Sequence, residues 1–258
     1  MSSDSPVAFK TARHLLELES NSLASLPSGC PLLDDLIGGG FYPGTVTEIS
    51  GEAGCGKSQI GMQFAATSIA NGHNVICVET ERGFSVKRVH QMLQHRAKNV
   101  ESAMQRLLIS SPSTMEQYMH VLTKIEESSE QLYKTSVIIV DSIATFFRGE
   151  LVLEDFQNWR RALTILCKVA LLHNIAVIIV NHVASRKNAS SDDWKTMPFL
   201  SHVPARRPTI RIWLDRTTDG RRTRRQISLV KSPFSPKRKA EYFIMNAGVS
   251  LLQNQSPE

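Results

Sequence analysis

The residues with the clearest chemical meaning form one short stretch, Gly51-Glu52-Ala53-Gly54-Cys55-Gly56-Lys57-Ser58. A glycine, four residues, a second glycine, a lysine and a serine make the pattern of a phosphate-binding P-loop. Backbone N–H groups of such a loop turn inward around an anion, and the helix that follows adds its partial positive charge. We expect Lys57 to reach the β and γ phosphates of a nucleotide and Ser58 to hold Mg²⁺. The alternative is a glycine-rich turn that binds nothing.

The segments on either side of the loop favour nucleotide binding. Residues 46–50 predict a short buried strand, and Ile60, Phe64 and Ile69 have helical spacing. A strand, a glycine loop and a helix are the context that a P-loop requires. The predicted nucleotide-binding residues are Gly51, Glu52, Ala53, Gly54, Cys55, Gly56, Lys57, Ser58 and Gln59.

Two further predicted strands end in acidic residues. Residues 75–78 are followed by Glu79-Thr80-Glu81, and the four aliphatic residues 137–140 are followed by Asp141. Carboxylates at the C-terminal ends of parallel strands lie on the ligand side of the sheet. One of the glutamates is therefore a candidate for polarising a water beside a γ phosphate, unless the pair is only a solvated strand end. Asp141 has the Walker B form and is expected to hold the Mg²⁺ shell through Ser58 or water.

A histidine follows another aliphatic run. Residues 175–180 predict a strand that brings His182 to the same edge of the sheet. Two interpretations of His182 stay open, a hydrogen bond to the γ phosphate or a partly buried side chain satisfied by the protein. Residues 154–173 place Trp159 on the apolar face of a helix, which favours a core position over stacking on a base.

The composition suits one large α/β domain. The chain has 258 residues, 41% of them hydrophobic, enough to bury a full core. No apolar run approaches the roughly 18 residues of a membrane span and the N-terminus lacks a signal-peptide core, so we expect a soluble intracellular protein. The four cysteines lie singly, without metal-ligand spacing, and are expected to be reduced.

The net charge of +6 is unevenly placed. Between Arg206 and Lys239, twelve Lys or Arg residues stand against two Asp, a local charge of +10 that leaves the rest at −4. Such a patch indicates a polyanionic partner, and binding to a phosphate backbone should be weak, indifferent to sequence and steeply salt-dependent. The alternative is a solvated hairpin face or a nuclear-localisation-like run. The candidate DNA-binding residues are Arg206, Arg207, Arg221, Arg222, Arg224 and Arg225.

The remaining pattern completes the predicted fold. We expect a polar loop over residues 184–201, longer than compact domains usually keep without a function. Period-two alternation then predicts a hairpin through residues 217–220 and a last strand pair. The predicted fold is therefore α/β, with a mostly parallel central sheet flanked by helices and with C-terminal antiparallel hairpins. The other predicted helices and strands are helices near 13–18, 28–37, 85–97 and 115–125 and strands at 107–109, 210–214, 226–230, 242–245 and 249–252.

These motifs resemble the RecA-like recombinases, and within them the small eukaryotic recombinase paralogues. The resemblance covers residues 9–252 and rests on SGCPLLDDLIGGG, GTVTEISGEAGCGKSQ, VETERGF, VIIVDSIATFFRGE, AVIIVNHV and KSPFSP. It implies a RecA-like ATPase core that binds ATP and Mg²⁺. Lys57 and Ser58 would bind phosphate and metal, Glu81 would be the base that activates water, and Asp141 would be the Walker B acid. The polar loop after Val183 would lie beside the DNA axis of a filament.

Three departures from the family pattern favour an accessory paralogue over a strand-exchange enzyme. We expect the N-terminal helical DNA-binding domain of the family to be absent. The first DNA loop, over residues 146–150, is shorter than in the strand-exchange enzymes. His182 stands where those enzymes usually have a glutamine that couples the γ phosphate to the second DNA loop.

Two functions of different class follow. In the first, the chain is a recombination mediator and weak, DNA-dependent ATPase in the nucleus. It would bind another recombinase paralogue or adaptor and would stabilise or remodel a recombinase filament on single-stranded DNA. In the second, it is itself an ATP-driven strand-exchange enzyme. An unrelated P-loop kinase or transport ATPase would need a lid or signature motif that the sequence lacks.

The resemblance also predicts contacts between protomers. Phe9 and Ala12 have the spacing of a family motif that adds to the edge of the next protomer's sheet. Lys231 would lie near a neighbour's nucleotide, where a cation stabilises developing negative charge. The expected organisation is a linker over residues 1–26, the ATPase domain over 27–252 and a tail over 253–258.

Overall fold

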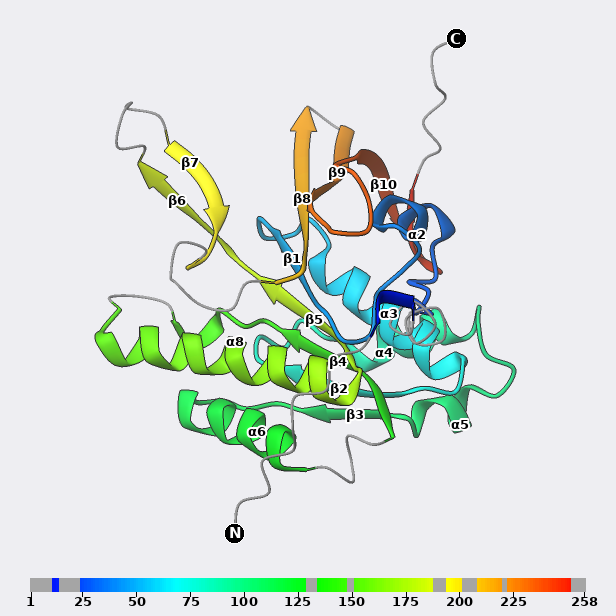
Figure 1. The fold of residues 1–258 in the computed structure, drawn as a ribbon. Coiled ribbons are helices and arrows are strands. Elements are labelled where there is room, and N and C mark those ends of the chain that lie inside the picture. Colours follow the sequence, from blue (N-terminus) through cyan, green and yellow to red (C-terminus); the bar gives the residue numbers. More distant parts are fainter. Residues whose placement is uncertain are drawn as a thin grey trace.

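A central sheet of mostly parallel strands organises the chain (Figure 1). The computed structural model describes residues 11–13, 24–128, 134–147, 151–187, 194–200, 208–219 and 222–251. Within these ranges nine strands form one sheet in the order β11-β10-β9-β8-β1-β5-β4-β2-β3. They are β1 (Val46–Gly51), β2 (Asn74–Glu79), β3 (Leu107–Ser110), β4 (Thr135–Asp141), β5 (Ala176–Asn181), β8 (Ile210–Asp219), β9 (Arg222–Lys231), β10 (Lys239–Met245) and β11 (Gly248–Leu251).

The strand directions confirm the predicted fold class. All neighbouring strands from β8 across to β3 pair in parallel, whereas β8, β9, β10 and β11 pair with one another antiparallel. The parallel strands therefore deliver their C-terminal residues to one edge, and the registers pair Glu79 with Asp141 and Ser50 with Asn181. The acids predicted to lie together thus end neighbouring strands.

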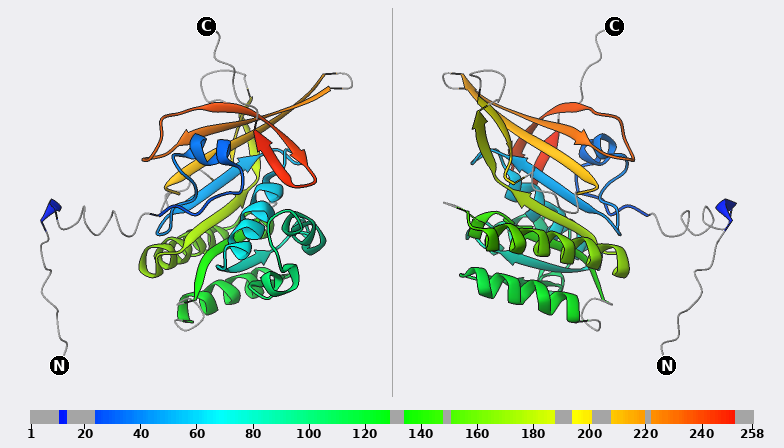
Figure 2. Two further views of the ribbon diagram at one scale, coloured as in Figure 1. Left: turned by 90° about the vertical axis from the view of Figure 1, so that its right-hand side faces the viewer. Right: turned by 60° about the vertical axis from the view of Figure 1, so that its left-hand side comes forward.

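Helices cover both faces of the sheet (Figure 2). Along β4, Val137 and Ile139 pack on one face, and Ile138 and Val140 pack on the other. Burial on both sides explains why this strand is a continuous aliphatic run rather than an alternating one. The first face is covered by α2 (Pro31–Ile37), α3 (Lys57–Ala70), α4 (Val86–Leu93) and α5 (Val100–Met104), and the second by α6 (Met115–Glu127) and α8 (Leu153–His173).

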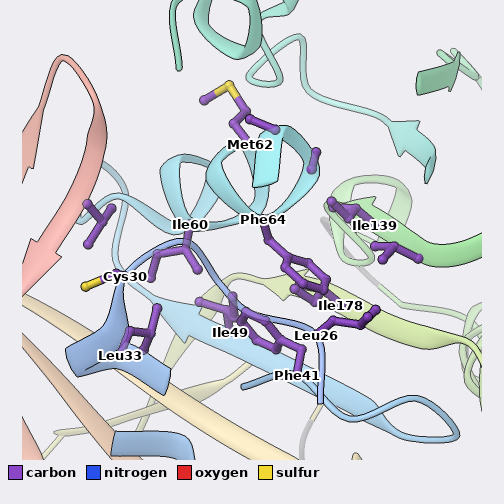
Figure 3. Packing of buried hydrophobic residues seen from close by; sticks show 14 of the residues in the cluster. Leu26, Cys30, Leu33, Phe41, Ile49, Ile60, Met62, Phe64, Ile139 and Ile178 are labelled. Carbon is purple, nitrogen blue, oxygen red and sulfur yellow. The ribbon is translucent and has the colours of Figure 1, made fainter. Parts of the chain in front are cut away.

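The core under α3 fixes both ends of the P-loop. Ile60 and Phe64 point from α3 toward the sheet, where they meet Ile49 of β1 (Figure 3). The rings of Phe64 and Phe41 pack with their centroids 4.4 Å apart. On the opposite face Trp159 is buried, as predicted. Because β1 and α3 are anchored by these contacts, the loop that joins them has a fixed span.

Two predicted segments differ from the structure. The helix predicted over residues 85–97 ends at Leu93, and a separate helix, α5, begins after Asn99, whose side chain accepts a hydrogen bond from Ser102 N at 3.0 Å. The predicted polar loop contains an antiparallel pair, β6 (Val183–Lys187) and β7 (Trp194–Pro198), so the prediction of a structureless loop was wrong. The two strands pair only with each other in the described ranges.

Other features agree with the sequence or lie outside the described ranges. The four cysteines are free thiols, as expected. Among the described residues, no helix has the length and apolar composition needed to cross a bilayer. The helix predicted near residues 13–18 lies mostly outside the described part, as do residues 148–150 of the first DNA loop.

Candidate nucleotide-binding site

The P-loop joins β1 to α3 at the C-terminal edge of the sheet. Gly51 ends β1, and a Cβ atom at this position would lie 2.3 Å from the carbonyl oxygen of Leu214 on β8. A side chain would collide with backbone there, so the close approach of β8 requires glycine. Gly56 precedes α3 with φ of 104°, and the first N–H groups of the helix are left for a ligand in the loop.

Lys57 lies buried along the loop, with 7% of its surface exposed. Its Nζ donates hydrogen bonds to the carbonyl oxygens of Gly51 at 2.8 Å and Glu52 at 2.9 Å. An ammonium group has three N–H donors, so a third remains for an anion. The positive charge is thus held beside the N-terminus of α3, where it favours binding of phosphate.

Asp141 and Ser58 meet next to the loop. Asp141 is 4% exposed, and its carboxyl group accepts a hydrogen bond from the Ser58 hydroxyl. Its other oxygen, Oδ2, is buried and has no hydrogen-bond partner among the described residues. Burial raises the pKa of Asp141 above its ordinary value of 3.8, and the bond from Ser58 opposes this shift. A buried carboxylate oxygen of this kind suits a cation or a water molecule bound to one.

A cavity of about 400 Å³ brings the predicted chemical groups together. Of the predicted nucleotide-binding residues, only Gly51, Glu52 and Cys55 do not line it. Gly51 and Glu52 hold Lys57 instead, while the buried Cys55 thiol bonds to the carbonyl oxygen of Glu52 at 2.9 Å. The cavity is within the size range of small-ligand pockets. Its lining residues are Ala53, Gly54, Gly56, Lys57, Ser58, Gln59, Glu81, Asp141, Val180, His182 and Ile244.

Glu81 and His182 contact each other in this cavity. His182 Nε2 lies 2.7 Å from Glu81 Oε1, and the Thr145 hydroxyl donates to the same oxygen at 3.0 Å. The two side chains are about one quarter exposed, at 26% for Glu81 and 23% for His182. Solvent can therefore reach the carboxylate, although two neighbours fix its position. Of the two interpretations of His182, this contact supports the one in which a protein group satisfies the side chain, and that group is the candidate base Glu81.

Hydroxyl groups at the ends of β2 and β4 support Glu81. Thr80 Oγ1 donates to the carbonyl oxygen of Ser142 and accepts from the Ser142 N–H, both at 2.9 Å. Thr145 Oγ1 lies 2.6 Å from Thr80 Oγ1 and 2.9 Å from the Ser142 hydroxyl. The carboxylate of Glu81 is thus positioned relative to Asp141 by a network that spans both strand ends.

The C-terminal strands form a wall of the site that the sequence patterns did not predict. Ile244 of β10 lines the cavity, and its Cδ1 would lie 2.9 Å from a Cβ atom at Gly56. The Tyr242 hydroxyl donates to the carbonyl oxygen of Cys55 in the P-loop. Arg88 bonds Gln59 Oε1 at 2.9 Å and the carbonyl oxygen of Asn246 at 2.8 Å, which ties α3 and α4 to the β10–β11 turn. No local motif marks these residues, because their partners are distant in the sequence.

These residues fit a nucleotide with Mg²⁺. The glycine loop and the Lys57 ammonium suit phosphate oxygens, whereas Ser58 and the unpartnered Oδ2 of Asp141 suit a hard cation. No cluster of three or more His, Cys, Asp or Glu side chains with metal-ligand geometry occurs among the described residues.

The other predicted residues are only partly described. Arg224 is exposed on β9 and Arg225 is half-buried beside it, whereas only the backbone of Arg222 is described. Lys231 Nζ donates to the carbonyl oxygen of Pro208 at 2.7 Å, and its contact with a neighbour's nucleotide stays a prediction. Ala12 is exposed in the short described segment 11–13. Arg206, Arg207, Arg221 and Phe9 lie outside the described residues.

Replacing Asp141 with asparagine is expected to raise the Tm of the protein in EDTA at pH 7. Because burial raises the pKa of folded Asp141 above its unfolded value, this group stabilises the fold below the unfolded pKa and loses that contribution as pH rises through the folded pKa. Asparagine carries no charge at any pH, so the variant avoids this loss of stability. A change of about 1 kcal/mol in the free energy of unfolding corresponds to about 2–4 °C in the Tm of a chain of this size. The gain in Tm should disappear below about pH 4, where Asp141 is protonated in both the folded and the unfolded wild type.

Thermal scans with and without Mg·ATP provide the second part of this test. The nucleotide should stabilise the wild type far more than Asp141→Asn, because the variant lacks the carboxylate that suits the cation. Asp35→Asn is the matched control, since its side chain is 76% exposed and its ion pair with Arg238 is at the surface. An unchanged or lower Tm for Asp141→Asn in EDTA would contradict the claim that the buried charge of Asp141 lowers the stability of the fold.

Comparison of the sequence with known proteins identifies one family. The Rad51 family matches residues 19–251. The chain is 34% identical to the DNA repair and recombination protein RadB of Thermococcus kodakarensis over 159 residues, which cover 61% of this chain and 70% of the relative. It is 30% identical to RadB of Halobacterium salinarum, over 76% of this chain and 83% of the relative. It is 28% identical to RadA of Methanoculleus marisnigri, over 93% and 79% respectively.

Proposed function

The chain belongs to the Rad51 family, and we propose that it is an ATP-binding accessory member that acts in homologous recombination in the nucleus. It joins a partner paralogue or adaptor, contacts the main recombinase filament on single-stranded DNA, and stabilises or remodels that filament. The relatives named as DNA repair and recombination proteins support this class of process. They are archaeal, so the assignment to a eukaryotic paralogue rests on the resemblance of the motifs alone.

The observation that carries the proposal is a complete nucleotide site whose base is in contact with His182. The Lys57 ammonium and the loop N–H groups bind phosphate, and Ser58 and Asp141 hold the cation. Mg²⁺ supplies neutralisation of phosphate charge when bound. Glu81 accepts the proton of an attacking water. His182 and Thr145 both hold Glu81 Oε1, and we expect slow turnover because these contacts restrain the candidate base.

We propose the organisation that the sequence motifs predict. The ATPase domain occupies residues 27–252, the segment 1–26 is a linker that contacts a neighbouring protomer, and 253–258 is a tail. The basic hairpin residues Arg222, Arg224 and Arg225 supply contacts to the DNA backbone, together with Arg206, Arg207 and Arg221.

Pull-down of purified recombinase tests the proposal. With ATP and Mg²⁺ the tagged chain, together with its partner, should retain recombinase, and omission of ATP should lower the amount retained. Lys57→Ala should resemble the reaction without ATP. Equal retention of recombinase in all three reactions would contradict a nucleotide-gated contact.

The second candidate function is autonomous DNA strand exchange. The presence of Lys57, Ser58, Glu81 and Asp141 in one cavity favours it, because a strand-exchange enzyme needs the same site. A joint-molecule assay with this chain alone separates the two functions. Efficient strand exchange without any other recombinase would establish the second.

Phe9→Glu is expected to abolish binding to one neighbouring protomer while leaving Mg·ATP affinity unchanged. On the acceptor side, β3 is an edge strand of the sheet, and its Leu108 and Ile109 are 55% and 38% exposed. A cavity of about 410 Å³ lies where β3 meets α6. An extended peptide can pair with such an edge and place an aromatic side chain in a pocket. The residues that line this cavity between β3 and α6 are Ser110, Ser111, Pro112, Glu116, Gln117, His120 and Val121.

Co-purification with each candidate partner measures this effect. Burial of one phenylalanine contributes about 1.5–3 kcal/mol, so its loss changes affinity about ten-fold or more. Phe243→Glu is the matched control, because Phe243 is an exposed phenylalanine at the opposite side of the sheet. If Phe9→Glu still co-purified with every partner, residues 9–12 would not be an assembly motif.

A further inference from the structure

The connection between β9 and β10 is an exposed loop that lies beside α2 (Figure 1). Residues 232–238 form neither helix nor strand, and Pro236, Lys237 and Arg238 are all exposed. Such a segment can enter the cleft of another enzyme in extended form without disruption of the central sheet. The loop is therefore accessible to a protein-modifying enzyme.

The two serines of this loop differ in the hydrogen bonds of their hydroxyl groups. The Ser232 hydroxyl accepts a hydrogen bond from the Phe234 N–H at 3.0 Å. Ser235 is partly exposed, and within the described part of the chain its hydroxyl has no hydrogen-bond partner. The Ser235 oxygen can therefore act as a nucleophile without the loss of an internal hydrogen bond.

The sequence after Ser235 has a pattern that the other serine–proline pairs of the chain lack. Five serines are followed by proline, and only Ser235 also has a basic residue three positions on, in Ser235-Pro236-Lys237-Arg238. Proline-directed protein kinases select a serine followed by proline, whose ring fixes φ and leaves no N–H to satisfy, and many of them prefer a positive charge at the third position. Both determinants are exposed in this loop. The other four serines followed by proline are Ser5, Ser111, Ser232 and Ser256.

Two contacts hold the loop against α2 and the residues that follow this helix. Arg238 Nη1 pairs with Asp35 Oδ2 at 3.2 Å, and the two side chains are 47% and 76% exposed. The ring of Phe234 stacks on the ring of Tyr42 with the centroids 3.9 Å apart. An exposed ion pair contributes little to stability, so Arg238 can leave Asp35 at a small cost. An anion of higher charge in the same loop would therefore compete with Asp35 for the guanidinium group.

We propose that Ser235 is a phosphorylation site for a proline-directed protein kinase and that Arg238 binds the phosphate in place of Asp35. In the reaction, Ser235 Oγ attacks the γ phosphorus of the kinase's ATP and forms the new O–P bond, while the bond from that phosphorus to the bridging oxygen breaks. ADP leaves with the bonding electrons, and the hydroxyl proton passes to a carboxylate of the kinase. The product carries a charge of about −1.5 to −2 and three acceptor oxygens, which suit a guanidinium group. This inference goes beyond the proposed function and does not depend on it.

The test is phosphorylation of the purified full-length chain by a cyclin-dependent kinase with labelled ATP, followed by mass spectrometry. Ser235 should be the modified residue. Its kcat/KM should lie within about ten-fold of the value for a synthetic peptide of residues 230–242, because the loop gives up only an exposed ion pair and one ring contact. Ser235→Ala should remove the incorporation, and Arg238→Gln should lower kcat/KM several-fold in chain and peptide alike. Ser232→Ala is the matched control, and its rate should equal that of the wild type.

Three results would overturn the phosphorylation site. The first is undiminished incorporation of phosphate in Ser235→Ala. The second is a kcat/KM for the folded chain that is more than about ten-fold below that of the peptide, since the loop would then be closed to the kinase. The third is no phosphorylation of the peptide itself, since its sequence would then not be a kinase substrate.

Phosphorus NMR of the phosphorylated chain tests the contact with Arg238. The second pKa of the phosphate should be lower in the wild type than in Arg238→Gln, because the guanidinium group stabilises the dianion. Lys237→Gln removes an equal charge from the adjacent residue and should raise this pKa less, since an ammonium group forms no bidentate pair. An equal or larger effect of Lys237→Gln, or no effect of Arg238→Gln, would overturn the assignment of Arg238.

Discussion

Glu81→Gln is expected to lower the rate of ATP hydrolysis by about 10²–10⁴-fold while changing Mg·ATP affinity by no more than about two-fold. Glutamine keeps the size of the side chain and can still bond Thr145 and His182, but its amide cannot accept a proton from water. Loss of rate without loss of affinity identifies a group that acts in the transition state.

Single-turnover release of phosphate at saturating ATP measures the first quantity, and titration of a fluorescent ATP analogue measures the second. Glu101→Gln is the matched control, since that side chain is 87% exposed and lies outside the residues of the cavity. If Glu81→Gln hydrolysed ATP at the wild-type rate, the base would have to be another group. The buried Glu79 at the end of β2 would then be the next residue to replace.

Lys57→Ala is expected to weaken nucleotide binding by roughly 10–150-fold. A hydrogen bond to a charged group contributes about 1.5–3 kcal/mol, and each 1.4 kcal/mol is about a factor of ten. The buried ammonium lies inside the loop and keeps one N–H donor for phosphate, so alanine removes both the charge and that bond. Isothermal titration with ATP and Mg²⁺ gives the two affinities directly.

The control for Lys57→Ala is an exposed lysine. Lys98→Ala removes an equal charge, and Lys98 does not line the cavity of the P-loop. Its ATP affinity should equal that of the wild type. Equal ATP binding by wild type and Lys57→Ala would refute the assignment of the P-loop itself, and circular dichroism of the variant checks that the fold is intact.

The local motifs predicted much of the fold and the centre of the site. The P-loop, Glu81 and Asp141 each follow a buried strand, and parallel strands bring their ends to one edge, so a one-dimensional pattern was enough to place them together. The helical spacing of apolar residues predicted the buried position of Trp159, and the continuous aliphatic strands indicated a sheet covered on both faces.

The rest depends on contacts between residues far apart in the sequence. Ile244 and Tyr242 reach the P-loop from β10, and no spacing in the sequence relates them to it. The β6–β7 pair was missed because its strands are polar and short, without the apolar alternation that marks a half-buried strand. His182 was correctly placed at the edge of the sheet, but its contact with Glu81 depends on side-chain geometry that a pattern does not contain.

The lifetime of recombinase filaments on single-stranded DNA tests the central claim most directly. Labelled recombinase is assembled on oligo-dT, an excess of unlabelled DNA is added, and the dissociation rate is measured with this chain and its partner at substoichiometric amounts. We predict that dissociation slows several-fold when Mg·ATP is present and that Lys57→Ala removes the effect. A dissociation rate that is the same with wild type, with Lys57→Ala and with no added chain would contradict the role of an ATP-dependent accessory protein.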